Sequence, residues 1–495
     1  MASRLITFKK WMKANGVDCS DALTLVEDKN GDVSVKASRD LKEGDVVANI
    51  SKTACLTIKT SGAREMIESA ELDGSLGLSV AIMYERGLGD KSPWSGYLQI
   101  LPFQEDLPLV WPVEELDSLL SGTEIHKDVK RDHGLVYEDW EENIVPLTSS
   151  LPENVDPGSF GIKEYLAAKS LIASRSFEID DYHGSGMVPL ADLFNHKTGE
   201  EDVHFTAELP HSESESEADD TANKATDEDE PSSPDQSLEG ENTDEEAKEE
   251  EENEGEEEEE EDSSMLQNDV TSLEMIMVKN VPAGTEVYNT YGLIGNAALL
   301  HRYGFTELDN LYNIVNIDLD LVTEWSTSSF TSRHTQARLS LFKKLGYNNS
   351  DYFEVSSTGE PETELLILLN ILLLPEETYL TLSGDDDCVS KEVTIGKHKV
   401  VFGESCSSDV LLTDNGVCEA LLDIVDKRES LYGTRSSLEE DVVRVESCVL
   451  PRDRRLYHSL VLRVSERRIL EKLRSNVREK VKEFSGGKRR KKMKL

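Results

Sequence analysis

The chain has 495 residues, of which 37% are hydrophobic, and this is enough to form the cores of two or three domains. Its formal net charge is −47, with 99 Asp and Glu against 52 Lys and Arg, which argues against direct binding of nucleic acid. No run approaches the roughly 20 apolar residues that cross a bilayer, and the N-terminus lacks the apolar core of a signal peptide. We therefore expect neither a secreted nor a membrane-spanning protein, and place the chain in the nucleus, the cytoplasm or both.

The first half of the chain alternates short strands with a helical block. Leu5, Phe8, Trp11 and Met12 have helical spacing, which predicts a short amphipathic helix over 5–15. The segment NGDVSVKASRDLKEGDVVANI then predicts two short strands around a turn. Helical periodicity dominates 61–122 and returns at 161–177, and the strand-like segment MVPLADLFNH follows at 187–196.

Charge is unevenly distributed along the second half. Residues 212–262 contain 27 Asp and Glu against 2 Lys, and the surrounding segment 210–264 is too poor in apolar residues to offset the entropy cost of ordering. We expect it to be a disordered insertion within a domain, because SLEMIMVKNVPAGTEVYNTYG resumes strand character directly afterwards and begins another turn-linked pair. Helices are predicted over most of 332–450, and a basic amphipathic helix over 451–484 precedes a basic tail at 485–495.

The cysteines show no metal-binding pattern. None forms a Cys-x-x-Cys pair or lies near histidines at zinc-ligand spacing. We interpret them as reduced thiols and predict no metal site; they are Cys19, Cys55, Cys388, Cys406, Cys418 and Cys448.

Three segments combine glycine, amide and aromatic residues in a specific order. The first is GDVSVKASRDLKEGDVV at 31–47, and the second is VPLADLFNH at 188–196 with SRSF upstream at 174–177. The third is EVYNTYG at 286–292, followed by NAALLHRYGF at 296–305. Together they resemble the SET-domain protein methyltransferases of the Rubisco lysine-methyltransferase type.

This resemblance implies an α+β fold. The SET domain, built of short β-sheets with a pseudoknot, would cover 1–310 and include a helical block inserted at about 60–180. An all-α substrate-binding domain would follow at 311–484, with the basic tail after it. The family binds S-adenosylmethionine and transfers its methyl group to a protein.

The resemblance also assigns roles to residues. Tyr291 would be the catalytic tyrosine. Residues expected to hold S-adenosylmethionine are Gly31, Asp32, Val33, Asn195, His196, Tyr291 and Phe305, although Asp32 and Val33 stand where the family commonly has glycines. Residues expected on the substrate side are Arg175, Ile179, Asp192, Tyr291 and Tyr303.

Methyl transfer explains why these residue types are needed. A sulfonium methyl group is displaced in line by a neutral amine, yet a lysine in water has a pKa of about 10.4 and is almost fully protonated. A narrow aromatic channel removes solvent, lowers that pKa and aligns the amine behind the methyl carbon.

The resemblance therefore implies a lysine methyltransferase that acts on a protein other than a histone, such as a ribosomal or nuclear protein. We expect the substrate to be basic and lysine-rich and the enzyme to be a monomer. Two alternatives remain open. A relative of the same fold methylates histidine, and the motifs do not separate the two targets. The chain could also be an inactive acidic binding protein or chaperone, in which the segment 212–262 binds the partner.

Overall fold

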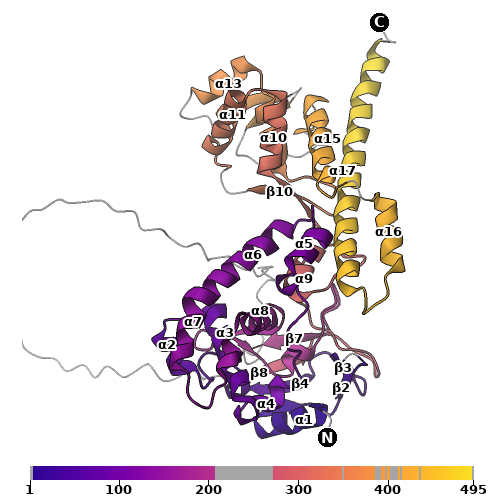
Figure 1. Cartoon of the computed structure of the whole chain (residues 1–495). Helices are drawn as coiled ribbons and strands as arrows, with labels where there is room; N and C mark the ends of the chain where they lie inside the picture. Colours follow the sequence, from indigo (N-terminus) through magenta and orange to yellow (C-terminus); the bar gives the residue numbers. More distant parts are fainter. Residues whose placement is uncertain are drawn as a thin grey trace, which may run out of the picture.

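The computed structural model divides into two parts joined by one long helix, α17 (Arg454–Lys492) (Figure 1). The first part contains the four-stranded sheet and the elements up to α9, and the second contains the elements from β9 onward. The structure describes residues 4–29, 31–206, 271–347, 351–384, 392–395, 398–401, 411–412, 415–433 and 436–492.

The N-terminal helix α1 (Arg4–Ala14) packs on α4 (Ser95–Leu98) and confirms the helix predicted there. Its inward face carries Phe8 and Met12, both buried. Trp11 stacks on Tyr97 of α4 with ring centroids 5.9 Å apart. Aromatic packing of this kind anchors the chain start to the helical block.

A four-stranded antiparallel sheet forms the centre of the first part, in the order β1-β4-β8-β7. Its strands are β1 (Val17–Cys19), β4 (Val46–Ser51), β7 (Val203–Thr206) and β8 (Ser272–Met277). Alternate residues of β8 are buried, as expected for a strand with one face on a core. The predicted disordered segment 210–264 lies outside the described residues, but the strands on either side of it, β7 and β8, pair with each other.

The predicted pairing of the first strands is wrong. β3 (Val33–Ala37) pairs with β2 (Leu23–Glu27), and β4 lies in the central sheet. The strand pair expected over 272–291 is also wrong, since only β8 is a strand and later residues form isolated bridges with residues far away in the sequence. Short apolar runs predict strands, but not their partners: β3 pairs with the strand just before it, whereas β4 pairs with the distant strand β8.

The helical block lies between β4 and β7 and confirms the helical periodicity of 61–122 and 161–177. Its centre is the packing of α3 on α8, and Leu78 and Leu171 are fully buried. The α-helices of the block are α2 (Arg64–Ser69), α3 (Gly74–Leu88), α4, α5 (Val113–Leu119), α6 (His126–Asp139), α7 (Val145–Leu147) and α8 (Ile162–Arg175). Short 3-10 or π turns connect these elements: η1 (Lys52–Ala54), η2 (Gly89–Lys91), η3 (Pro108–Val110), η4 (Trp140–Ile144), η5 (Thr148–Ser150) and η6 (Pro157–Phe160).

A hairpin of β5 (Ser176–Asp180) and β6 (Gly184–Met187) follows α8. The strand predicted over 187–196 is wrong beyond Met187, because the chain there forms the 3-10 helix η7 (Ala191–Leu193). Leu190 has φ of 79°, a left-handed conformation that interrupts any strand. The helix α9 (Asn296–Tyr303) completes the first part.

The second part is mainly helical and has a hydrophobic core of its own, but it is not all-α as predicted. Two small antiparallel sheets add to it: β9 with β10, and β11 with β12. The β9–β10 ladder forms because Val315, Ile317, Phe353 and Val355 alternate into the core. The elements are β9 (Val315–Asp318), α10 (Leu319–Ser329), α11 (Ser332–Lys344), β10 (Tyr352–Val355), α12 (Thr363–Leu372), α13 (Glu376–Ser383), β11 (Glu392–Ile395), β12 (His398–Val401), α15 (Asn415–Ser430), α16 (Leu438–Ser447) and α17.

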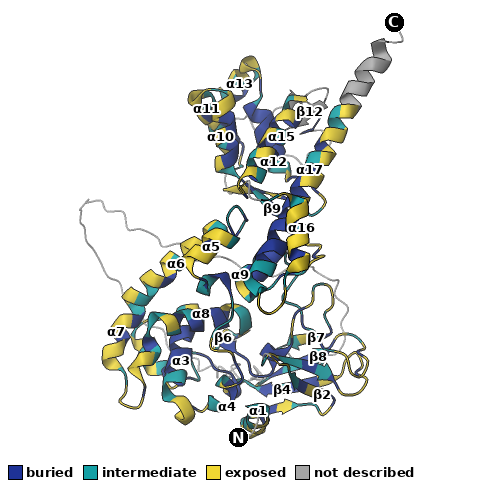
Figure 2. Cartoon of the chain, turned by 45° about the vertical axis from the view of Figure 1, so that its right-hand side comes forward, coloured by how far each residue is buried: buried dark blue, intermediate teal, exposed yellow. Residues whose placement is uncertain are grey.

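The helix α17 contacts both parts. Leu462 packs in a cluster with Trp111 and Leu300 of the first part. Ile469 and Leu470 pack in the core of the second part, and the stretch beside α16 is mostly buried (Figure 2). Among the described residues no single helix is long and apolar enough to cross a membrane.

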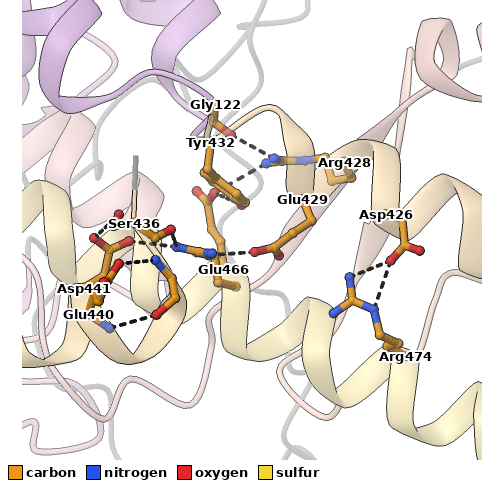
Figure 3. Close-up of polar contacts among 12 residues, drawn as sticks. Gly122, Asp426, Arg428, Glu429, Tyr432, Ser436, Glu440, Asp441, Glu466 and Arg474 are labelled. Atoms are coloured by element: carbon orange, nitrogen blue, oxygen red, sulfur yellow. Dashed lines mark hydrogen bonds and ion pairs between the residues drawn. The ribbon is translucent and has the colours of Figure 1, made fainter. Parts of the chain in front are cut away.

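Buried polar groups complete the joint between the parts (Figure 3). The guanidinium of Arg428 donates to the carbonyl of Gly122 at 2.8 Å and lies 3.4 Å from Glu466 Oε2. The same carboxylate oxygen accepts from the hydroxyl of Tyr432 at 2.6 Å. Because Gly122 belongs to the helical block, Arg428 ties that block to α15 and α17.

Candidate active site

Four aromatic rings from three segments gather at the end of α9. The Tyr291 ring lies between two others, stacked on Tyr303 at 4.4 Å and on His196 at 4.9 Å between centroids. Phe305 lies 6.1 Å from His196 and 6.4 Å from Tyr303. The structure thus brings together residues that are more than 90 positions apart in the chain.

Backbone hydrogen bonds hold Tyr291 in this position. Its N–H donates to Nδ1 of His196 at 2.9 Å, and its hydroxyl donates to the carbonyl of Phe194 at 3.2 Å. Just before it, the N–H of Asn289 donates to the carbonyl of Asn195 at 2.9 Å. The segment ending in Tyr291 therefore lies directly against the Asn195-His196 pair.

The same segment contacts β3 on its other side. The N–H of Val287 donates to the carbonyl of Val35 at 2.9 Å, and the N–H of Ala37 donates to the carbonyl of Thr285 at 2.9 Å. The three segments that carried the family resemblance consequently meet in one place.

His196 is fixed as a neutral imidazole. Its Nδ1 accepts from Tyr291, so Nε2 carries the hydrogen that faces Thr198 Oγ1 at 3.0 Å. Burial lowers the pKa of His196, and the carboxylate of Glu307 opposes that shift. Glu307 also accepts from the N–H of Thr198 at 3.1 Å, which links the His196 segment to the chain just after Phe305.

Asn195 is exposed beside this group, unlike its buried neighbours. Its Nδ2 donates to Oε1 of Glu286 at 2.7 Å. The sequence prediction missed both Glu286 and Glu307, although Glu286 begins the quoted segment EVYNTYG. A carboxylate five residues before a partly buried tyrosine carries no signal of its own, because the contact depends on tertiary structure.

Arg175 and Asp192 lie behind the aromatic group. Arg175 donates to the Asp192 carbonyl at 2.8 Å and to Oε1 of Glu105 at 2.6 Å. The Asp192 carboxylate accepts from the hydroxyl of Tyr97 at 2.8 Å. These contacts hold η7, which leads to the Phe194 carbonyl, so the two residues position backbone. Tyr97 and Glu105 were not predicted, since both come from the helical block.

The remaining predicted residues lie elsewhere. Ile179 is buried in β5. Gly31, Asp32 and Val33 form the turn and start of β3, where the N–H of Asp32 donates to Oδ1 of Asp28 at 2.9 Å. Within the described part of the chain, none of these four forms a hydrogen bond with the aromatic group. Their cofactor and substrate roles stay predictions.

Asp192 predicts a specific pH dependence of stability. Burial raises the pKa of Asp192 to about 6 from 3.8, and the charge of Arg175 only partly opposes this. The folded state then holds a proton that the unfolded state has lost, so stability falls as pH rises between the two pKa values. Relative to Asp192→Asn, the wild-type free energy of unfolding should fall by about 2–3 kcal/mol between about pH 4 and about pH 7. Urea denaturation at both pH values measures this difference, and a constant difference would contradict the prediction.

Comparison with known proteins identifies the fold of the chain. None of the protein-family models matches the chain. The structure of Rubisco LSMT bound to AdoMet superposes with a TM-score of 0.64 at 19% identity, covering 98% of this chain and 93% of that one. The chain has the SET-domain fold of the Rubisco LSMT type. The α+β prediction, with its helical C-terminal part, is confirmed.

Two curated relatives align with this SET-domain chain in sequence. Ribosomal lysine N-methyltransferase 3 of Saccharomyces cerevisiae is 25% identical over 339 residues, which cover 59% of this chain and 60% of that protein. The actin-histidine N-methyltransferase of Mus musculus is 22% identical over 481 residues, covering 94% of this chain and 66% of that protein. The chain therefore spans less than two thirds of the length of either relative.

Proposed function

We propose that the chain transfers a methyl group from S-adenosylmethionine to a lysine side chain of a protein. The observation that carries the proposal is the position of Tyr291, packed between two rings with its hydroxyl on the Phe194 carbonyl, next to the exposed amide of Asn195. The yeast relative, which is named as a ribosomal lysine methyltransferase, supports the same reaction and a ribosomal type of substrate.

Tyr291 orients the lysine amine. Burial raises the pKa of Tyr291 above its usual value, and the charge of Arg175 opposes the shift without cancelling it. The phenol therefore stays protonated at neutral pH and is a poor base. The lysine loses its proton to solvent before it attacks, and Tyr291 with the Phe194 carbonyl fixes the direction of the lone pair.

The residues around Asn195 fit S-adenosylmethionine, which supplies the methyl group as a sulfonium. Asn195 is exposed and offers both amide donors and an acceptor, with one donor directed to Glu286. Phe305 and the His196 ring provide flat apolar surface suited to an adenine ring. Desolvation by Tyr291 and Tyr303 lowers the pKa of an entering lysine.

Cofactor binding tests this proposal most directly. Calorimetric titration with S-adenosylhomocysteine should show saturable binding by the wild type and at least about 10-fold weaker binding by Asn195→Ala, which loses hydrogen bonds to a charged ligand. Asn49→Ala is the matched control, because Asn49 also donates to a glutamate but lies in β4. No binding by folded wild type would overturn the proposal and favour an acidic binding protein.

Histidine methylation is the second candidate, and the long alignment with the mouse actin-histidine enzyme favours it. Acid hydrolysis of protein labelled by the enzyme in a ribosomal extract separates the two reactions. Methylated lysine alone supports the first proposal, whereas methylhistidine alone would replace it with the second.

A further inference from the structure

A polar cleft of about 1000 Å³ lies between the two parts of the molecule, away from the aromatic group. We call it the interdomain cleft; its walls come from 121–132, α9, β9, β10 and the end of α15. His301 and Arg302 of α9 line it, and the next residue of α9, Tyr303, stacks on Tyr291. One short helix therefore borders both the cleft and the candidate active site.

Two buried oxygen atoms of residues that line this cleft have no hydrogen-bond partner among the described residues. They are Oε2 of Glu124 and Oδ1 of Asn316. Arg428 links the two segments, since it donates to the carbonyl of Asn316 and to that of Gly122, two residues before Glu124, each at 2.8 Å. An unpaired buried polar atom is costly and rare, so each marks a place for a ligand that donates hydrogen bonds.

The charged side chains that line the interdomain cleft favour the binding of a cation. Its lining contains six carboxylates: Glu124, Asp128, Asp132, Asp318, Asp320 and Asp351. Four cations line it as well, but three already have acidic partners: Lys127 pairs with Asp318, Arg131 with Asp128 and Arg428 with Glu466. Arg302 is exposed at the rim. The described residues include no group of three His, Cys, Asp or Glu side chains placed to hold a metal ion, which favours an organic cation.

The carboxyl groups of Glu124 and Glu466 differ in the hydrogen bonds that they accept. Glu466 accepts from the backbone N–H of Glu124 at 3.0 Å, from Tyr432 at 2.6 Å and from Arg428 at 3.4 Å, which stabilises its charged form. The Glu124 carboxyl has an oxygen, Oε2, to which no group in the described ranges donates. Of the two carboxyl groups, Glu124 therefore holds the proton when the cleft is empty.

The surroundings of Glu124 agree with this assignment. Burial, and then the charge of Glu466, raise the pKa of Glu124 well above its usual value, while Arg428 opposes the shift. Asp128 of α6 and Glu354 of β10 add to the increase. Glu354 is directly opposite Asn316 in the β9–β10 ladder, so one of the charges that raise the pKa of Glu124 lies on the strand beside Asn316.

We propose that the interdomain cleft receives a lysine or arginine side chain of the protein substrate, bound by Glu124 Oε2 and Asn316 Oδ1. The identity of the ligand as substrate rests on the proposed function. The substrate thus contributes two side chains: the residue that is methylated, and a separate lysine or arginine that binds in the interdomain cleft. Binding of the second side chain selects substrates with clustered basic residues.

Binding in this way releases a proton. The incoming cation donates to Glu124 Oε2, the carboxyl proton of Glu124 leaves to the buffer, and a carboxylate–cation pair remains. The pKa of Glu124 is high in the empty cleft and lower in the complex. Affinity for the cation therefore rises with pH until Glu124 is ionised in the free protein.

Calorimetry of the full chain with acetyl-tetralysine amide tests the proposal. Titrations near pH 7 in phosphate and in Tris, whose ionisation enthalpies differ, count the protons released. We expect the wild type to release up to one proton, and Glu124→Gln to release none and to bind about 10-fold more weakly. Carboxyl groups with ordinary pKa values are ionised at pH 7, so peptide bound to the acidic segment 212–262 releases no proton.

Three controls make the result specific. Glu141→Gln removes the same charge from an exposed position of the helical block and should behave as wild type. Asn316→Leu should weaken peptide binding yet keep the proton release. Acetyl-tetraglutamine amide should cause no release. The proposal is overturned if wild type releases no proton, or if Glu124→Gln releases as much as wild type.

The cofactor titration separates this proposal from the proposed function. If S-adenosylhomocysteine binds and the peptide releases no proton, only the cleft proposal fails. If the peptide releases a proton through Glu124 and S-adenosylhomocysteine does not bind, the cationic site stands and the methyltransferase proposal fails.

Discussion

Replacing Tyr291 with phenylalanine should lower the rate of methyl transfer about 100-fold, the cost of misplacing a reacting group by about 1 Å. The hydroxyl that donates to Phe194 is lost, but a phenylalanine ring still fits between His196 and Tyr303. Affinity for S-adenosylhomocysteine should therefore change by less than about twofold, because only the transition state loses an interaction. Incorporation of labelled methyl groups into a ribosomal extract measures the rate.

Tyr137→Phe provides the matched control for this experiment. Tyr137 lies on α6 with 48% of its surface exposed, so removing its hydroxyl should leave the rate unchanged. If Tyr291→Phe retains the wild-type rate, Tyr291 is not the catalytic tyrosine. If it loses cofactor binding as well, its role is to shape the cofactor wall.

Replacing Arg175 with methionine should destabilise the protein by about 3–5 kcal/mol, the usual cost of breaking a buried ion pair by removing one partner. Asp192 is fully buried at its side chain, and Glu105 is nearly so, with 14% exposed. Without the guanidinium, both carboxylates lose a cation and the Asp192 carbonyl loses its donor. Urea denaturation at neutral pH measures the loss.

Two comparisons separate this effect from a simple loss of packing. The destabilisation should shrink at about pH 5, where Asp192, with a pKa of about 6, becomes protonated and needs no counter-ion. Arg64→Met should cost less than about 1 kcal/mol, because the pair of Arg64 with Glu68 is exposed. An equal loss at both pH values would argue against unpaired charge as the cause.

Local patterns predicted the helices well. The helix around Phe8 and Met12 and the helix α8 follow directly from apolar residues at helical spacing. The order of the glycine, Asn-His and tyrosine segments also predicted which residues meet, because Asn195, His196, Tyr291, Tyr303 and Phe305 do lie together.

Contacts between distant segments could not be predicted from the sequence. β4 follows β3 in the chain but does not pair with it; one of its two partners, β8, is more than 200 residues away. The supporting residues Glu286, Glu105 and Tyr97 act through tertiary hydrogen bonds, and nothing in their neighbours distinguishes them from surface polar residues. Only the folded arrangement identifies them.

The passage of α17 through both parts has a consequence for how the molecule unfolds. His458 of α17 accepts from the N–H of Thr306 at 3.0 Å, one residue beyond Phe305, while Leu470 and Leu473 of the same helix are fully buried in the second core. Fraying this helix would therefore loosen the wall of the candidate active site and open the second core together. The two halves are in this respect one cooperative unit, in which stability of the distant helices is transmitted to the geometry around Tyr291.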